Sequence, residues 1–451
     1  MALSRRDLLT RTGAAGLGIV LAGSVDTLFT APASAAPRAG GGPYGYGPLL
    51  PDPNGLLDLP EGFRYRVLSA AGDTLSTGGR VPGNHDGMGV FGRRDSRVLV
   101  RNHELTGLTN SATTAATPDL VFDPTVGGGT TTLQLTASNQ LLDHRVSLAG
   151  TIRNCAGGIT PWDTWLTCEE TETVTGVAPH GWNFEVDPFA PDNNRNPVPL
   201  RAMGRFAHEA VAVDPSNGTV YETEDASGPF GLLYRFVPNA PLGGYGSLRE
   251  GGALSAMKVP GLADLSQVTT PGTTFRGITW VPVGDPEAKT VSTRRQFTDT
   301  QVTRAQKLEG AWWGGDSLFF ACSYNRPRPG FPAHDGQVWK YTPAADELEL
   351  VLHLSTGGRF DSPDNICVSP FGGGVMIAED GGDAQYLVGT TVDNEPFAFA
   401  KNALNDGELA GVVFTEDGST LYANLYTPGI TLAITGPWGK RSEKTVGATF
   451  S

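Results

Sequence analysis

The feature that most constrains the fold is a short apolar run that recurs along the chain and ends each time in acidic or amide side chains. These runs are 98–104, 165–170, 220–225, 318–325, 375–380 and 421–425. Several follow another short strand across a tight turn, as at 214–218 and 416–418, which contain Asn-Gly and Asp-Gly. Because these dipeptides are strong β-hairpin signals, the pattern predicts a chain built from repeated antiparallel hairpins.

About six such units, irregularly spaced, predict an all-β protein with the architecture of a six-bladed β-propeller. Alternating strands such as 232–237 and 337–341 fit the half-buried outer strands of blades. We expect segments 242–268 and 284–305 to be long inserted loops on one face. A pair of β-sandwiches is the rival architecture, but nothing resembling an interdomain linker divides the chain. Residues 36–451 are therefore expected to form a single β-propeller domain.

The N-terminus has the features of an export signal. Arg5 and Arg6 precede a weakly apolar stretch, 14–21, and residues 33–35 form an Ala-Ser-Ala cleavage signal. The arginine pair indicates a twin-arginine signal peptide over residues 1–35. The alternative is an ordinary secretory signal with a chance arginine pair. We therefore expect a secreted, monomeric protein that is exported already folded by the twin-arginine machinery.

The composition indicates which molecules the protein can bind and whether its cysteines form disulfides. The formal net charge of −14 excludes nucleic acid as an expected partner, because phosphates would be repelled. The four cysteines are Cys155, Cys168, Cys322 and Cys367. An even number permits disulfides, but a protein that folds in the reducing cytoplasm before export keeps its thiols free. We expect none of the four to be paired.

The side chains that end the strands are candidate metal ligands. In a propeller the strands converge on a central channel, and clustered carboxylates are costly to bury unless cations lie between them. Oxygen-rich sites suit hard cations such as Ca²⁺, and glycines beside a thiol allow the backbone to approach a metal closely. Each candidate also has an ordinary explanation, as a turn residue, a solvated charge or a small buried side chain. The candidates are Cys155, Glu104, Glu169, Glu209, Glu309 and Asp364.

Several segments, taken in order, resemble the successive motifs of PhoX-type alkaline phosphatases. They are 102–104, 154–170, 208–210, Glu309 and 362–365. The 154–170 segment is highly specific, and the resemblance spans nearly the whole mature chain. It implies a six-bladed propeller whose channel holds a pair of ferric ions and several Ca²⁺ ions. The implied activity is hydrolysis of small phosphate monoesters.

The resemblance also implies roles for individual residues. Cys155 matches an iron-ligating cysteine, and Glu209 and Glu309 match metal-binding carboxylates of the catalytic centre. Lys307 stands where family members carry an arginine that contacts phosphate, and a lysine cannot make a bidentate contact. Further residues in matching motifs are Glu104, Glu169 and Asp364.

Two other functions remain open from the residues alone. A calcium-dependent propeller lactonase or esterase would use the channel carboxylates but leave Cys155 without a role. A non-catalytic calcium-binding propeller would use the same carboxylates without any reaction. Bound iron distinguishes the phosphatase from both, because a ferric–thiolate centre absorbs visible light.

Overall fold

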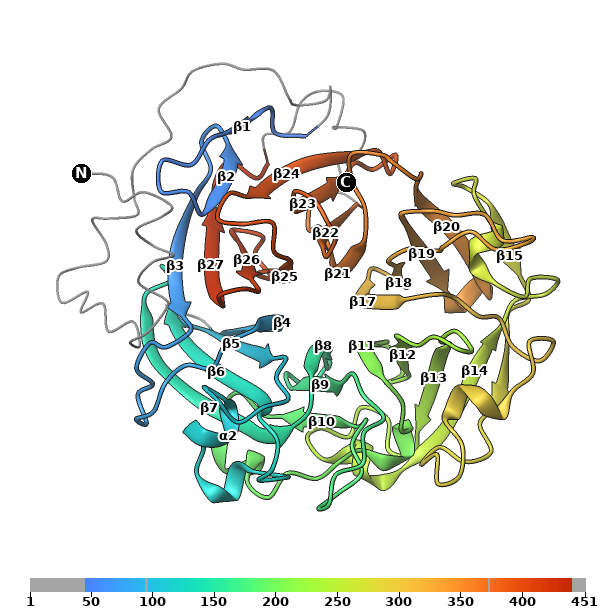
Figure 1. Cartoon of the computed structure of the whole chain (residues 1–451), viewed down its shortest axis with the longest axis horizontal. Helices are drawn as coiled ribbons and strands as arrows, with labels where there is room; N and C mark the ends of the chain where they lie inside the picture. The colour runs from blue at the N-terminus through green and yellow to red at the C-terminus, as the bar shows by residue number, and fades with distance from the viewer. Residues whose placement is uncertain (1–44, 94–95, 372–373, 440–451) are drawn as a thin grey trace.

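The computed structural model describes residues 45–93, 96–371 and 374–439. These residues form six antiparallel sheets around a central axis, with almost no helix (Figure 1). The prediction of an all-β, six-bladed β-propeller is confirmed. No helix in the described ranges is long and apolar enough to cross a membrane. The predicted signal peptide, 1–35, lies outside the described residues.

The first three blades contain three to five strands each, in order from the innermost strand outward. Blade 1 comprises β4 (His85–Arg93), β5 (Ser96–His103), β6 (Gly128–Thr136) and β7 (Leu141–Thr151). Blade 2 comprises β8 (Asn154–Ile159), β9 (Trp165–Glu169) and β10 (Asn183–Val186). Blade 3 comprises β11 (His208–Val213), β12 (Val220–Glu224), β13 (Leu233–Pro238), β14 (Gly252–Lys258) and β16 (Thr279–Pro282).

The last three blades borrow strands from elsewhere in the chain. Blade 4 comprises β17 (Leu308–Gly314), β18 (Ser317–Cys322), β19 (Gly336–Thr342), β20 (Glu347–Leu354) and β15 (Thr274–Arg276). Blade 5 comprises β21 (Pro363–Val368), β22 (Val375–Glu379), β23 (Tyr386–Thr390), β24 (Pro396–Asn402), β2 (Leu57–Pro60) and β1 (Leu49–Leu50). Blade 6 comprises β25 (Leu409–Phe414), β26 (Thr420–Leu425), β27 (Ile430–Thr435) and β3 (Arg64–Ala70).

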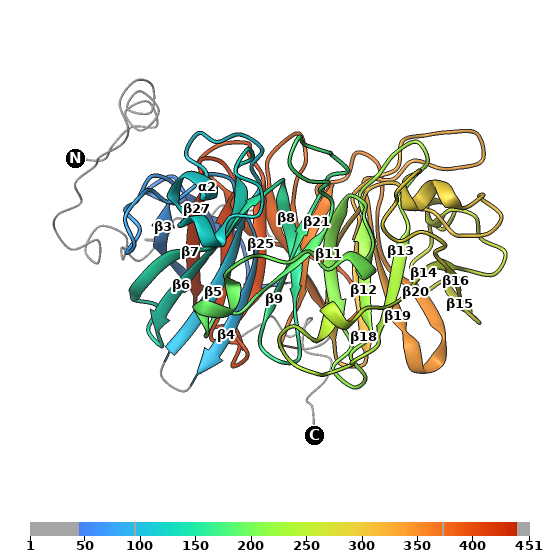
Figure 2. The same cartoon turned by 90° about the horizontal axis from the view of Figure 1, so that it is seen from below.

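Strands from the two ends of the described chain close the ring of blades. In blade 6, β3 pairs antiparallel with β27, so that Tyr65 lies opposite Ile434. In blade 5, β2 pairs with β24, so that Leu57 lies opposite Asn402. The blades are thereby joined into a closed circle, and the six innermost strands are fixed around the axis (Figure 1). Seen from the side, the sheets stand next to one another in a single thick disc (Figure 2).

The core lies between neighbouring blades. Trp165 and Phe184 of blade 2 pack in one cluster with Val98 of blade 1. Leu233 of blade 3 packs in another with Trp339 of blade 4. Fully burying one such side chain contributes about 1.5–3 kcal/mol. Because each sheet is packed on both faces in this way, the innermost strands have little freedom to move relative to one another.

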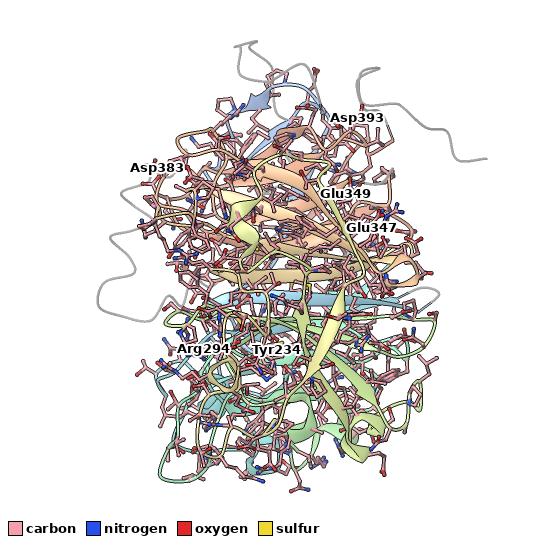
Figure 3. The ribbon with its side chains drawn as sticks, turned by 90° about the vertical axis from the view of Figure 1, so that its right-hand side faces the viewer. Tyr234, Arg294, Glu347, Glu349, Asp383 and Asp393 are labelled. Atoms are coloured by element: carbon pink, nitrogen blue, oxygen red, sulfur yellow. The ribbon has the colours of Figure 1, made fainter. Side chains whose placement is uncertain are left out.

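The two expected insertions differ in structure. Segment 242–268 is only partly loop, because Gly252–Lys258 forms β14, with Leu254 and Ala256 buried on the same side. Segment 284–305 is a loop anchored by Arg294, whose guanidinium donates to Glu224 over 3.0 Å. The Tyr234 hydroxyl donates to the same carboxylate over 2.8 Å, and Figure 3 shows Arg294 beside Tyr234.

Candidate metal centre

Each innermost strand departs from regular pairing at an equivalent point. In all six pairs of innermost and second strands in the described chain, two residues of the inner strand oppose one of its partner. Such a bulge bends the strand and re-aims a side chain. We call the first bulged residues the ring positions. They are Asp86, Cys155, Glu209, Glu309, Asp364 and Gly411.

Side chains from four blades meet at the ring in two overlapping groups. Ligand atoms of Cys155, Glu170 and Glu209 all lie within 4.8 Å of one another, as do those of Glu209, Glu309 and Asp364. Glu209 therefore belongs to both groups. These donor atoms are close enough for a single ion to contact three of them in each group.

Asp86 adds a fifth ring side chain from blade 1. It is buried, and its Oδ1 atom has no hydrogen-bond partner among the described residues. Its backbone oxygen accepts a hydrogen bond from Asn424 over 2.6 Å. Burial raises the pKa of Asp86 well above the usual range, and the carboxylates of Glu104, Asp364 and Glu209 raise it further. A buried carboxyl group with one oxygen lacking a donor, near other carboxylates, is suited to a cation.

A second circle of residues follows the second strand of each blade. Each of their backbone N–H groups donates to the carbonyl of a residue just before an innermost strand, as Glu170 does to Arg153 over 3.0 Å. We call these the rim positions. They are Glu104, Glu170, Asp225, Ser323, Asp380 and Tyr426. Four of the six are acidic, so the rim adds negative charge above the ring.

Two basic side chains are held among the rim carboxylates. Arg153 binds Glu104 through its Nε atom over 2.9 Å and also pairs with Glu170. Lys307 Nζ lies 2.7 Å from Asp225 Oδ2 and 2.9 Å from Glu309 Oε1. Although burial opposes it, these two carboxylates raise the pKa of Lys307 above its usual value. Lys307 therefore stays a fixed positive charge beside the ring.

The backbone is strained where the inner strands begin. Asn84, Arg153, Lys307 and Ser362 have φ angles of 47°, 52°, 52° and 44°. Left-handed backbone is uncommon for residues other than glycine and costs on the order of 1–2 kcal/mol. Each of the four precedes a ring residue by two positions, so the strain recurs where the chain turns a ligand toward the axis.

Burial and mutual repulsion act together on the ring. Burial raises the pKa of Glu209 and Glu309 well above the usual carboxyl range, and neighbouring carboxylates raise it further. Burial also raises the pKa of the Cys155 thiol, with a further contribution from Glu209. Like charges this close cannot all ionise without compensation, and a bound cation supplies that compensation. The donor set therefore fits metal ions, through several oxygens and one sulfur.

Buried polar side chains hold the backbone of the ring residues. The Asn102 amide donates to the backbone oxygens of Cys155 and Ala156 over 3.0 and 2.7 Å. Its oxygen accepts from Trp165 Nε1 over 3.0 Å. In blade 3, the Thr223 hydroxyl donates to the Glu309 backbone oxygen over 2.6 Å. These bonds join neighbouring blades, so Asn102 and Thr223 fix the backbone of the ring residues Cys155 and Glu309.

Glycine allows the inner strands to approach closely. A Cβ atom on Gly310 would lie 2.5 Å from the backbone oxygen of Asp364, and one on Gly411 would lie 2.4 Å from that of Asp86. Beyond the ring, away from the rim, lies a cavity of about 20 Å³ lined by Met88, Trp165, Trp312 and smaller residues of the inner strands. This is room for about one water molecule. Among the described residues, this cavity has no room for a molecule much larger than water.

The structure brings together most of the residues predicted from sequence. Cys155, Glu209, Glu309 and Asp364 share the two ligand groups, and Lys307 contacts Glu309. Glu104 lies at the rim, outside both groups, where Arg153 and the Tyr426 hydroxyl bind its carboxylate.

Glu169 does not reach the ring. Its fully buried carboxylate accepts hydrogen bonds from the backbone N–H groups of Ile152, Gly181 and Trp182 over 2.8, 2.8 and 3.1 Å. His180 Nδ1 lies 2.6 Å from the same carboxylate, and its Nε2 lies 3.2 Å from Asp123. Because all of these contacts are local, Glu169 stabilises blade 2, and Glu170 is the one of the pair that joins a candidate ligand group.

Sequence reasoning also missed Asp86 and gave Glu170 no separate role. The only local signal at Asp86 is the small residue that follows it, Gly87. The same feature recurs at Glu309-Gly310 and Cys155-Ala156, where a ligand precedes a small residue at the start of a strand. That signal is weak in one blade and becomes informative only when the blades are superposed.

Fold and site together define a class: β-propellers with a buried cluster of side chains in the central channel that could hold metal ions. Residues 44–145 and 136–429 match the family described as alkaline phosphatase PhoX. The chain belongs to the PhoX alkaline phosphatase family. Among curated proteins, none matches this chain.

The solved structures that this chain matches are distant from it in sequence. A gluconolactonase from Xanthomonas campestris is 12% identical, with a TM-score of 0.42, over 91% of this chain and 99% of that one. The PQQ domain of a pyranose dehydrogenase from Coprinopsis cinerea is 11% identical, with a TM-score of 0.35, over 84% and 97%. TolB from Acinetobacter baumannii is 10% identical, with a TM-score of 0.35, over 77% and 65%.

Proposed function

We propose that the protein hydrolyses phosphate monoesters with the help of metal ions held by the ring. The observation that carries this proposal is the meeting of Cys155, Glu209, Glu309 and Asp364, from four blades, beside the ammonium group of Lys307. Carboxylates crowded in this way need cations, and cations at the channel mouth reverse the local charge. An acidic protein can then bind an anionic ester. Membership of an alkaline phosphatase family supports the same reaction.

The two ligand groups favour different ions. The group of Cys155, Glu170 and Glu209 includes a thiol, which binds metals as the thiolate, and we assign ferric iron to it. The group of Glu209, Glu309 and Asp364 offers only oxygen atoms, which suit Ca²⁺. Bound cations would stabilise the negative charge on the phosphoryl oxygens in the transition state.

Two basic side chains of the protein would orient the ester. Lys307 is held by Asp225 and Glu309, so little conformational entropy remains to be lost when its ammonium group binds a phosphoryl oxygen. Arg153 is held in a similar way by Glu104 and Glu170. Both cations lie on the rim side of the ring, so they would attract the phosphoryl group and leave the organic part of the ester directed outward.

Phosphate release from metal-loaded protein tests the proposal. The wild type should hydrolyse a phosphate monoester and not a gluconolactone, whereas E209Q and E309Q should lose most of the activity together with bound metal. The control is E349Q on β20, near the outer edge of blade 4, which should change neither (Figure 3). Lactone hydrolysis without phosphate release would instead support the lactonase. Full phosphatase activity of E209Q with no metal bound would refute the metal centre.

We also propose that residues 1–35 direct export by the twin-arginine route. The PhoX family is generally extracellular, and the Arg5-Arg6 pair supports this route. Replacing both arginines with lysine should leave folded, metal-containing protein inside the cell. Undiminished export of the double variant would indicate an ordinary secretory signal.

A further inference from the structure

A second cavity opens beside the rim, between the loops that follow β12 and β18. It has a volume of about 270 Å³. Its walls include the rings of Phe230 and Phe331, and its lining also includes Asp264, Arg304 and Arg328. A cavity of about 150 Å³ is enough to hold a benzene molecule, so this one has room for a substituted aromatic ring.

Two stretches of chain tie this cavity to the proposed phosphoryl site. Gly228, in its lining, follows the rim residue Asp225 by three positions, and Arg304 precedes Lys307 by three. Three residues span at most about 11 Å. Asp225 and Lys307 are themselves in contact, with 2.7 Å between Oδ2 and Nζ. The backbone at Gly228 therefore lies within about 11 Å of that at Asp225, and the backbone at Arg304 within about 11 Å of that at Lys307, which places the cavity next to the proposed phosphoryl site.

Backbone pairing keeps this arrangement rigid. Gly231 forms an antiparallel bridge with Ala305, and Asp264 forms a parallel bridge with Arg304. The Arg304 guanidinium also donates to the backbone oxygen of Phe230 over 3.0 Å. The loop that carries Phe230 is thus fastened to the segment that leads to Lys307, and the aromatic wall keeps its place relative to the ring.

The chemistry of the walls selects a neutral, flat group. The Arg328 guanidinium carbon lies 4.3 and 4.0 Å from the ring centres of Phe230 and Phe331. Arg328 is paired with Asp264 over 2.7 Å, and Arg304 is paired with Asp299. Both guanidinium charges are therefore balanced, which gives a second anionic group little to bind. Phenyl rings and the guanidinium group of Arg328 stacked on them instead favour contact with another π-system.

We propose that this cavity is a subsite for the leaving group of the substrate, and that it selects monoesters of neutral, aromatic alcohols. The proposal rests on the proposed phosphatase function. The phosphoryl group would bind at the ring beside Lys307, and the organic group would extend past Asp225 into the cavity lined by Phe230, Arg328 and Phe331.

Competing esters of similar intrinsic reactivity test the subsite. Benzyl phosphate and ethyl phosphate both release an alcohol of high pKa, so the ratio of their kcat/KM values reports mainly on binding of the organic group. The wild type should prefer benzyl phosphate by about tenfold or more, which corresponds to about 1.4 kcal/mol of stacking and burial. An added carboxylate on the ethyl ester should not improve kcat/KM, because the cavity has no uncompensated positive charge.

Two variants act on the cavity in opposite ways. F331A removes one wall, and A263F fills the space with a lining residue. Both should lower the benzyl-to-ethyl ratio about tenfold and leave kcat/KM for ethyl phosphate within about twofold, on the scale of a single aromatic contact. The control is R326A, on the same loop but outside the cavity lining, which should leave the ratio unchanged. Melting curves identify any variant that has simply lost its fold.

The outcomes separate the two proposals. If the esters are hydrolysed but F331A and A263F keep the wild-type ratio, the subsite is wrong and the phosphatase function stands. If both variants lose activity equally toward the two esters, the cavity has only a structural role. If metal-loaded wild type hydrolyses neither ester, the phosphatase function is wrong and the subsite falls with it.

Discussion

Two adjacent glutamates, Glu169 and Glu170, provide the sharpest test of the metal centre. Changing each to glutamine removes a charge while keeping nearly the same shape. Glu169 is surrounded by local donors, whereas Glu170 lies with Cys155 and Glu209 in one ligand group. We therefore expect E169Q to destabilise the fold without changing a candidate ligand, and E170Q to remove the charge of a candidate ligand without destabilising the fold.

The contacts in the structure set the size of each effect. The Glu169 carboxylate accepts three backbone hydrogen bonds and contacts His180. In E169Q the glutamine amide keeps one acceptor oxygen but turns its NH₂ group toward backbone N–H donors. Breaking a buried charged pair costs about 3–5 kcal/mol. The ion pair of Glu170 with Arg153 is partly exposed and contributes about 1 kcal/mol at most. Burial and repulsion from Asp225 both raise the Glu170 pKa, so removing this charge also relieves strain in the metal-free chain.

Unfolding and metal binding must be measured separately. Urea unfolding in excess chelator gives the stability of the metal-free chain, because bound metal would itself add stability. We expect E169Q to lose about 3–5 kcal/mol and E170Q to stay within about 1 kcal/mol of wild type. In metal titrations, E170Q should bind more than about tenfold more weakly, since even the loss of an outer partner of a ligand costs that much. The reverse pattern, with weak binding in E169Q and loss of stability in E170Q, would refute this placement.

Three further changes test the ring and its surroundings. C155A should lose bound iron and its visible absorbance while the fold survives. C168A, in the apolar core, should keep both and lose about 1 kcal/mol or somewhat more of unfolding free energy. Equal iron content in the two variants would contradict the assignment. Burial alone would lower the pKa of His180, but its hydrogen bonds to two buried carboxylates raise this pKa above 6.5. The contribution of protonated His180 to stability is therefore complete below about pH 6.5. It is lost as the pH rises through the higher pKa of the folded state. H180Q should therefore destabilise the metal-free chain at pH 5 more than at pH 9 in urea titrations, and an equal loss at both would contradict the charge assignment. G310A should cost about 1–3 kcal/mol and weaken metal binding, because its Cβ would meet the Asp364 backbone. G284A, whose Cβ would meet only the Gln296 side chain at 3.7 Å, should be neutral in melting and metal titrations.

The architecture could be predicted from sequence because hairpin signals are local. Turns such as 214–218 and 416–418 fix antiparallel neighbours within a few residues, and six such units leave few closed arrangements. The closing strands could not be predicted in the same way. The pairing of β3 with β27 joins the two ends of the described chain, and nothing local in 64–70 identifies its partner.

The residues of the candidate site could be predicted only where a polar residue near a strand end also fell in a motif of the family. Cys155, Glu209, Glu309 and Asp364 follow that pattern and meet at the ring. The choice between Glu169 and Glu170 depends on which face of the strand each side chain takes, and the bulge between Asn154 and Gly157 shifts the register opposite these residues. Simple alternation along the sequence therefore could not decide it.

Backbone hydrogen bonds that recur in all six described blades explain why the ring positions can carry different residues. The rim N–H groups of all six described blades donate to backbone carbonyls, so these bonds hold whatever side chain a ring position carries. Gly411 occupies the sixth position without a ligand atom, and its N–H donates to the Asn365 side chain over 2.6 Å instead. The backbone thus fixes six ring positions, and the residue at each position decides whether it offers an atom that could bind a metal ion. A scaffold of this kind separates fold from chemistry, which is why the chemistry must be argued from the ring residues and not from the propeller itself.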